Sequence, residues 1–234
     1  KGEFMTNEDI ESALRRLEKL QNDGVKVITY NGNRSDFTVM SSAITDKRLA
    51  ARVALRSIDL QNQAEEIATA IYPSLNNVAK ALDVKGKRTA QEGEPEIGGA
   101  NAADMLQGNA VDPNTDEKVD IETSQRLFTE YAEEDVRANV RVFNALKNNT
   151  GKQITISLAG GNQATGNIRS VKPTWHQGAT SSKIKLTGVD GVLDNLAEAD
   201  TGRDLEGIFM EIESVGIPLS SERTTSLEAQ EAML

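Results

Sequence analysis

The sequence predicts an α+β protein in which a stem of two or three long helices carries an N-terminal β-hairpin and a small C-terminal antiparallel β domain. Along residues 46–71 and 123–146, apolar or small residues recur mostly at steps of three or four, which favours amphipathic helices. Since neither stripe can be buried alone, we expect the two helices to pack antiparallel. After residue 150, short alternating runs separated by glycines favour strands instead.

The first domain is predicted over residues 5–84, as a helix, a hairpin and a long helix. A first helix is expected over Thr6–Asp23, with Thr6 as its cap and Gly24 at its end. The hairpin is expected to pair Val25–Tyr30 with Asp36–Met40, because Asn31-Gly32 between them is a strong turn signal. The long helix follows and stops before Pro73, and a short helix over 74–84 comes next. We interpret residues 1–4 as an expression scar.

Residues 85–116 are rich in glycine and poor in apolar side chains, so we predict a flexible linker there, interrupted by a short helix at Ala102–Gln107. A third long helix, within 117–148, is expected to pack on the stem. Residues 149–219 form the predicted small β domain. Its expected strands are Gln153–Leu158, Asn167–Val171, Lys183–Leu186 and Ile208–Ser214, with one helical turn at Leu193–Ala199. Residues 220–234 are predicted to be a polar tail.

Composition excludes several classes of site. The chain has no cysteine, so it can form neither a disulfide nor a thiolate zinc site, and one histidine cannot make a multi-histidine metal site. The net charge of -10 argues against broad contact with nucleic-acid phosphate. We see no apolar run near the roughly 20 residues that a membrane-spanning helix needs.

The N-terminal 55 or so residues resemble the head–tail joining protein family of phage lambda. The resemblance rests on the order helix, hairpin, helix and on three stretches of sequence. These are Ala13–Leu17, Val25–Tyr30 and Arg34–Thr38. The resemblance implies a structural role in a virion.

The C-terminal third resembles the first hairpin of a small Sm-like or SH3-like barrel. This second resemblance rests on Gly151–Leu158, Gly161 and Gly166–Val171, where glycines permit the strong strand bending that such barrels need. Because these barrels serve as adaptors in many settings, the resemblance implies a fold and no particular activity.

Residues 112–123 resemble a calcium loop, with oxygen ligands expected from Asp112, Asn114, Asp116 and Asp120. Two positions depart from that pattern, because Glu117 replaces the turn glycine and Thr123 replaces the bidentate glutamate. The other interpretation is an acidic segment before a helix, where carboxylates are favoured in any case. Apart from calcium in this loop, we expect no cofactor.

Two further sets of residues are candidate contact points. Arg48, Arg52 and Arg56 are spaced by four and lie on one helical face. They could bind an acidic partner or nucleic acid, but we favour pairing with the acidic cluster at 130–135. Trp175 and His176 lie side by side in a polar stretch, which is typical of a protein contact.

A His176-centred catalytic site would need partners for this side chain, and by type alone they are Ser181, Asp190 and Asp194. From the helical core and the absence of a convincing catalytic motif, we predict a non-enzymatic structural or assembly protein, such as a phage virion or head–tail connector component. It would act through protein partners, form a homo-oligomer, and occur in the virion or the host cytoplasm. We do not expect it to bind nucleic acid broadly, although a local basic patch could still do so. One alternative is a secreted bacterial effector without a cleaved signal peptide. Another is a small hydrolase centred on His176.

Overall fold

A computed structural model of the chain describes residues 5–68, 73–89, 102–112, 114–171, 176–180 and 183–187. For Ala68, Ala103 and the last two of these ranges it describes the backbone alone. The chain divides into two compact units, which are treated separately here. The N-terminal unit comprises residues 5–66 together with residues from 171 onward, and the central unit comprises residues 67–170.

The N-terminal unit begins with a helix that is capped as the sequence predicts. Helix α1 spans Asn7–Asn22, and Thr6 and Asp9 form a reciprocal capping box at its start. The hydrogen bonds from Thr6 hold the pKa of the Asp9 carboxyl below its ordinary value. The elements that follow are β1 (Ile28–Thr29), α2 (Asp36–Ala43), α3 (Lys47–Arg56), β2 (Ile58–Asp59), α4 (Leu60–Ala68), β5 (His176–Thr180) and β6 (Lys183–Thr187).

The predicted N-terminal hairpin is wrong, because its second half is helical. Asn31 adopts a φ of 64°, and the N–H of Phe37 then donates to the Gly32 carbonyl at 2.8 Å, which starts α2. Strand β1 pairs instead with β2, in parallel, with Ile28 opposite Ile58. The loss of the hairpin also removes the structural basis of the resemblance to the head–tail joining family.

The first predicted stem helix, residues 46–71, is broken at Ser57. The hydroxyl of Ser57 donates to the Val53 carbonyl at 2.7 Å, and its backbone is extended with ψ 150°. A serine hydroxyl can compete in this way with the helical hydrogen-bond ladder. The result is α3, the two-residue strand β2 and then α4. The apolar stripe is nonetheless buried, as at Leu49, Val53 and Leu60, each 0% exposed.

The core of the N-terminal unit lies between α1, α2 and α3. It is aliphatic and small, with Phe37 as its one aromatic member among the described residues. The buried residues are Leu14, Phe37, Ile44, Leu49, Ala50, Ala51, Val53, Ala54 and Leu55. The small side chains of these alanines allow α3 to pack closely against α1 and α2.

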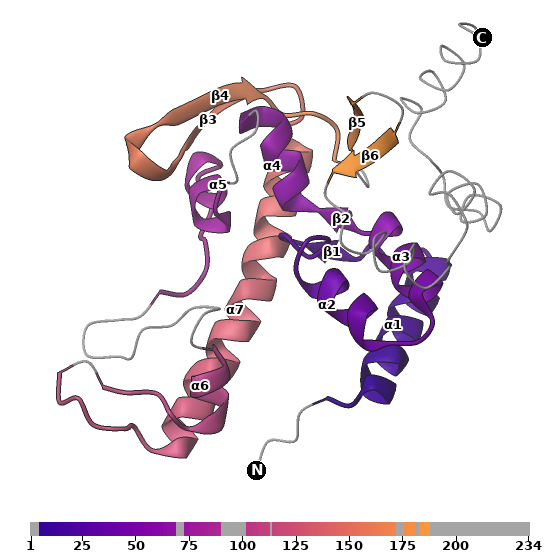
Figure 1. Ribbon diagram of the computed structural model, residues 1–234. Helices are drawn as coiled ribbons and strands as arrows, with labels where there is room; N and C mark the ends of the chain where they lie inside the picture. Colours follow the sequence, from indigo (N-terminus) through magenta and orange to yellow (C-terminus); the bar gives the residue numbers. More distant parts are fainter. Residues whose placement is uncertain are drawn as a thin grey trace, which may run out of the picture. The chain divides into compact units, whose positions relative to one another are not determined.

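The central unit is built along α7, which spans Ile121–Asn148 and confirms the predicted third helix. Figure 1 shows α6 beside the amino-terminal part of α7. The other elements are α5 (Leu75–Ala81), α6 (Ala102–Gln107), β3 (Gln153–Ser157), the 3₁₀ turn η1 (Ala159–Gly161) and β4 (Gln163–Asn167). Helix α6 has the bounds that the sequence predicts.

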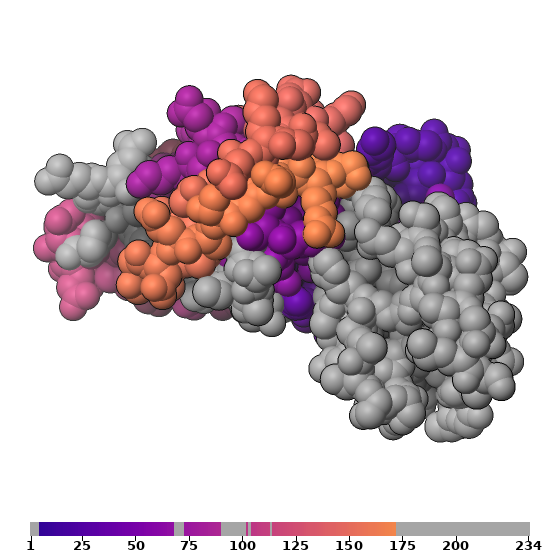
Figure 2. Space-filling model, turned by 90° about the horizontal axis from the view of Figure 1, so that it is seen from above, coloured from indigo at the N-terminus to yellow at the C-terminus, as the bar shows by residue number. Residues whose placement is uncertain are grey.

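In this unit, buried side chains pack α6 against α7, and the β3–β4 hairpin packs against α5. Met105 and Leu127, each 1% exposed, share a small cluster, and the Ser124 hydroxyl donates to the Met105 carbonyl at 2.6 Å. Strands β3 and β4 form an antiparallel pair with Ile156 buried, and β3 packs against α5. In Figure 2 this hairpin is seen beside α5.

The predicted small barrel is not found in the part of the chain that the structure describes. There, each sheet has only two strands: β1–β2, β3–β4 and β5–β6. Gly160 and Gly161 both have positive φ, so the chain reverses tightly and β4 pairs directly back onto β3. Alternate residues of both strands are exposed, and a barrel wall does not close around them.

Several predictions lie outside the described residues: the scar at 1–4, the helical turn at 193–199, the strand at 208–214 and the tail at 220–234. Much of the predicted linker also does, and the domain boundaries stay a prediction. Within the described ranges, no helix combines the length and apolar character that crossing a bilayer requires.

Candidate functional site

One face of α7 carries three polar side chains spaced by four residues: Tyr131, Asp135 and Asn139. This spacing places them on successive turns of the same face. Oδ1 of Asp135 and Oδ1 of Asn139 are both buried, and the Asn139 oxygen receives no hydrogen bond from the described residues. Buried acceptors without donors are uncommon, so this face is a candidate for a functional role.

Lys87 brings a positive charge to the same face. Its Nζ lies 3.0 Å from Oδ1 of Asp135, so the ammonium and the carboxylate form an ion pair. The same Nζ lies 5.8 Å from the ring centroid of Tyr131, within cation–π range. Burial lowers the pKa of Lys87, but the contacts with Asp135 and Tyr131 outweigh this effect and raise the pKa above its ordinary value. The ammonium therefore stays charged beside the carboxylate.

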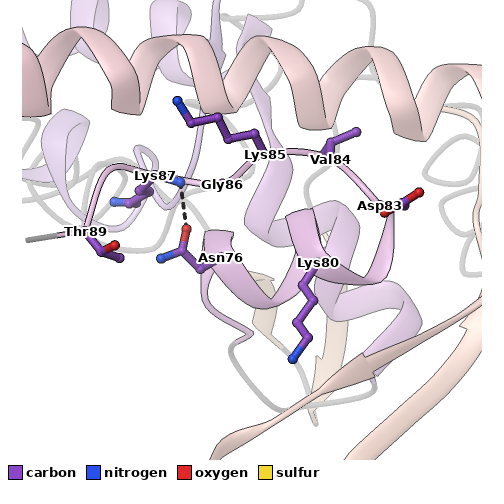
Figure 3. A pocket seen from close by; sticks show the side chains of 8 residues that line it. All are labelled: Asn76, Lys80, Asp83, Val84, Lys85, Gly86, Lys87 and Thr89. Carbon is purple, nitrogen blue, oxygen red and sulfur yellow. Dashed lines mark hydrogen bonds between the residues drawn. The ribbon is translucent and has the colours of Figure 1, made fainter. Parts of the chain in front are cut away.

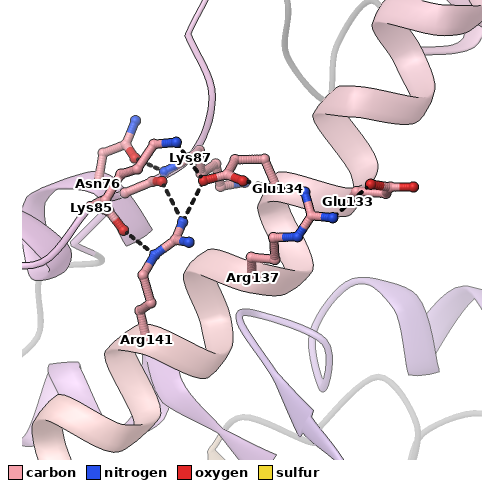
Figure 4. Close-up of polar contacts among 8 residues, drawn as sticks. Asn76, Lys85, Lys87, Glu133, Glu134, Arg137 and Arg141 are labelled. Atoms are coloured by element: carbon pink, nitrogen blue, oxygen red, sulfur yellow. Dashed lines mark hydrogen bonds and ion pairs between the residues drawn. The ribbon is translucent and has the colours of Figure 1, made fainter.

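The backbone that carries Lys87 is fixed from two sides (Figure 4). The Lys87 N–H donates to Oδ1 of Asn76 at 2.7 Å. Arg141 of α7 donates to the carbonyls of Lys85 at 2.8 Å and Gly86 at 3.1 Å. Gly86 fits because a Cβ there would lie 2.3 Å from the same Asn76 oxygen. The position of Lys87 thus depends on its neighbours in the fold.

Glu134 completes this arrangement on α7. Its Oε1 lies 2.7 Å from Arg141 and 3.0 Å from Nζ of Lys85. The hydrogen bonds from Lys85 and Arg141 hold the pKa of Glu134 below its ordinary value, against the opposing effect of burial. Glu134 is therefore ionised, and it anchors the guanidinium that fixes residues 85–86.

A pocket of about 450 Å³ adjoins this cluster, between the end of α5 and residues 83–89. Figure 3 shows the side chains that line it, with Lys87 among them. Lys87 therefore connects the pocket to Asp135. A carboxylate can accept a proton or a hydrogen bond, and an adjacent ammonium can offset negative charge on a bound group. The cluster has the elements of a site for an anionic substrate.

A protein-family comparison gives the class of protein. The family model of the RNase H superfamily matches residues 3–147, which is more than half of the chain and includes Lys87, Tyr131 and Asp135. The chain belongs to the RNase H superfamily. Neither the curated proteins nor the solved structures that were searched contain a match.

Membership of the RNase H superfamily overturns the main prediction from the sequence. The matched family is one of nuclease-like enzymes, not a phage head–tail joining family or an Sm-like or SH3-like barrel. The predictions of a non-enzymatic protein and of a phage virion component are therefore wrong. The expectation that the chain does not bind nucleic acid finds no support either. The alternative prediction, a hydrolase, agrees better with the family.

Nucleases commonly hold a pair of divalent metal ions between carboxylates. In the ranges that the structure describes, no three histidine, aspartate or glutamate side chains lie together in a way that could hold a metal ion. Glu134 is taken up by Arg141 and Lys85, and Asp135 lies beside Lys87. The described carboxylates of this RNase H superfamily member therefore do not fit a two-metal site by themselves.

Two carboxylates of the predicted calcium loop, those of Asp112 and Asp120, accept hydrogen bonds from backbone N–H groups close by in the sequence. Oδ1 of Asp112 accepts the N–H of Asn114 at 2.7 Å, and Asp116 has a φ of 60°. Asp120 caps α7 by accepting the N–H of Thr123 at 2.8 Å, and the hydrogen bonds from Thr123 lower the pKa of the Asp120 carboxyl. The structure therefore gives Asp120 the role of a helix cap, which was the other interpretation of this segment.

The predicted arginine ridge lies on α3 and contacts α1. Nε of Arg52 lies 2.6 Å from Oε1 of Glu18, and Arg56 donates to Oδ1 of Asn22 at 2.7 Å. Arg48 is on the same helix and also has an interaction partner. At residues 130–135, the acidic side chains pair within the central unit, as Glu134 does with Arg141. Arg52 and Arg56 thus contact α1, and not the acidic cluster at 130–135 that was expected to pair with them.

Trp175, Ser181, Asp190 and Asp194 lie outside the described residues. The backbone of His176 is in β5, opposite Thr187, and its side chain is not described. A His176-centred site stays a prediction. Sequence reasoning missed Lys87 and Asp135 because 48 positions separate them in the chain. The i, i+4 pair Tyr131 and Asp135 was the available signal, but Tyr131 was interpreted as part of the apolar stripe of residues 123–146 and Asp135 as part of the acidic cluster at 130–135.

Proposed function

We propose that this chain is a nuclease that hydrolyses phosphodiester bonds of nucleic acid, with Tyr131 and Asp135 of α7 at its centre. The observation that carries the proposal is the RNase H superfamily match, which covers Lys87 and all of α7 except its last residue. The 3.0 Å ion pair of Asp135 with Lys87, which lines the adjoining pocket, supports the choice of centre.

Each residue of the cluster has a role in this proposal. Phosphoryl transfer depends mainly on positioning and on the stabilisation of negative charge. As the oxygen of the attacking water bonds to phosphorus, the carboxylate of Asp135 would accept the proton of that water. The phosphorus–oxygen bond to the leaving group breaks, and the released oxygen takes a proton from solvent. Lys87 would offset the charge of the phosphate beside it. Tyr131, one turn before Asp135, would bound the site and offer its hydroxyl to the substrate or water.

The test is a cleavage assay with end-labelled single-stranded and duplex DNA and RNA, run in Mg²⁺ and in EDTA. We expect the native chain to shorten at least one of these substrates. Asp135→Asn should lower the rate by about 100-fold or more, in the range that proton-transfer catalysis commonly contributes. Glu133→Gln is the matched control, because Glu133 lies on the same helix, is 56% exposed and pairs with Arg137. It should leave the rate within about twofold, as expected for an exposed surface pair.

Two outcomes would count against the proposal, and they differ. If the native chain cleaves none of the four substrates in either buffer, the assignment as a nuclease fails. If the native chain cleaves and Asp135→Asn cleaves equally well, the activity stands and the assignment of Asp135 is wrong.

A further inference from the structure

Residues 80–89 are basic in an otherwise acidic chain. They contain four cationic side chains and a single carboxylate, whereas the whole chain has a net charge of -10. The cations are Lys80, Lys85, Lys87 and Arg88, and the carboxylate is Asp83. This local reversal of sign is the electrostatic pattern expected where a polyanion approaches.

Three of these lysines line the pocket of about 450 Å³ described above, together with Asn76 and Thr89. In Figure 3 their side chains extend in different directions: Lys85 toward α7, and Lys80 to the opposite side. A single small anion cannot be held by ammonium groups that diverge in this way. The successive phosphates of a strand, which are spread along its backbone, can meet them one after another.

Two of the lysines are available at little cost. Lys80 is exposed and has no ionic partner among the described residues. Lys85 pairs with Glu134, but its side chain is 72% exposed, and such pairs contribute only about 0–1 kcal/mol. Glu134 keeps Arg141 at 2.7 Å and Arg137 at 3.7 Å when Lys85 turns away. Lys85 can therefore transfer to a phosphate without leaving Glu134 unpaired.

Lys87 ties the pocket to the proposed centre of hydrolysis. Its backbone is held by Asn76, and the preceding carbonyls of Lys85 and Gly86 are held by Arg141. Its ammonium lies 3.0 Å from Asp135. A strand that lies along the pocket is thus led over a fixed segment to Asp135.

We propose that the pocket between α5 and residues 83–89 binds the phosphate backbone of a nucleic-acid strand through Lys80 and Lys85 and leads it toward Asp135. This inference rests on the proposed function, because it names the surface that positions the substrate of that activity. It assigns binding to residues that contact no reacting atom, so binding and hydrolysis can be tested separately.

The test measures the binding of a fluorescently labelled single-stranded oligonucleotide by anisotropy, in an Asp135→Asn background that does not consume the probe. The double variant Lys80→Gln/Lys85→Gln should raise Kd about tenfold or more near 50 mM salt. It should also reduce the slope of log Kd against log salt by roughly 0.7 for each lost phosphate contact. Lys80→Arg/Lys85→Arg should retain binding, since arginine also binds phosphate.

The control is Lys147→Gln/Lys152→Gln, two exposed lysines of the same unit whose replacement changes the net charge equally. This pair should shift Kd by less than about twofold. An equal loss in the control, an unchanged Kd in the pocket variant, or no binding by the parent would overturn the pocket proposal. Binding that depends on Lys80 and Lys85 in a chain that cleaves nothing would uphold the pocket and reject the nuclease. Cleavage by the native chain, together with an unchanged Kd in Lys80→Gln/Lys85→Gln, would uphold the nuclease and reject the pocket.

Discussion

Arg141 and Glu134 are paired on α7 with 2.7 Å between a guanidinium nitrogen and Oε1, although seven residues separate them. The same guanidinium donates to the carbonyls of Lys85 and Gly86. Glu134 thus orients the group that fixes a segment remote in sequence, and this segment carries Lys87 to Asp135. The site depends on this chain of contacts as much as on its own residues.

Replacement of Arg141 by Met should lower the thermal stability of the chain. The change removes three hydrogen bonds that involve a charged group, each worth about 1.5–3 kcal/mol at most, and leaves the Lys85 and Gly86 carbonyls without their donor. We expect a fall in Tm of roughly 3–10 °C by differential scanning calorimetry. Arg137→Met, at a 60% exposed side chain on the same helix, should shift Tm by less than about 2 °C. Equal shifts for the two variants would contradict the role given to Arg141.

Gly86→Ala should be destabilising because of Asn76. An added Cβ would lie 2.3 Å from Oδ1 of Asn76, so one of the two must move, at a cost of about 1–3 kcal/mol. A double-mutant cycle with Asn76→Ala tests the cause. In the Asn76→Ala background, Gly86→Ala should cost at least about 0.5 kcal/mol less, as expected for directly coupled residues. Strictly additive costs in chemical denaturation would show that the strain lies elsewhere.

The helices of the central unit were predictable, because their signals are local. The periodicity of residues 123–146 predicts α7, and Leu127 and Leu146 of that stripe are each 1% exposed. The break at Ser57 has no comparable signal, since residues 46–71 contain neither glycine nor proline. At the break, the Ser57 hydroxyl donates to the Val53 carbonyl, a contact that the sequence pattern does not reveal. Asn31-Gly32 was recognised as a turn, but a turn signal does not say whether a strand or a helix follows.

The candidate site was out of reach for a different reason. Lys87, Gly86 and Asn76 meet Asp135 and Arg141 only through tertiary packing. Acidic residues on a helix are most often a solvated or ion-paired face, and sequence alone cannot distinguish that case from a site. The observation that separates them is the 3.0 Å ion pair of Asp135 with Lys87, a residue that lines the adjoining pocket.

Glu134 makes stability depend on pH in the acid range. Hydrogen bonds from Lys85 and Arg141 place the folded-state pKa of Glu134 below the ordinary value of 4.5. Its contribution is therefore fully present above pH 4.5 and is lost as pH falls through the folded-state pKa. Thermal unfolding of Glu134→Gln between pH 6 and pH 3 should show a shallower loss of Tm below about pH 4.5 than the parent chain. Parallel Tm curves for the two proteins would contradict this role.

Replacement of the buried Asp59 should strongly destabilise the N-terminal unit. Asp59 is 1% exposed, and its carboxylate accepts the N–H groups of Asn31 at 2.8 Å, Asn33 at 2.9 Å and Gln61 at 3.0 Å. In Asp59→Asn, an amide has one acceptor oxygen in place of two, and its NH₂ group faces backbone donors. A buried group left without its partner costs about 1–3 kcal/mol, and more when a charge is involved.

We therefore expect Asp59→Asn to lower the free energy of unfolding in urea by about 2 kcal/mol or more. The matched control is Asp23→Asn, because Asp23 is 55% exposed and its partner Lys19 is 76% exposed. That change should stay within about 0.5 kcal/mol. If Asp59→Asn unfolds at the same urea concentration as the control, the carboxylate does not fix the loop after β1. If it unfolds earlier, amide hydrogen exchange should be fastest at Asn31 and Asn33, where the lost acceptor had protected the N–H groups.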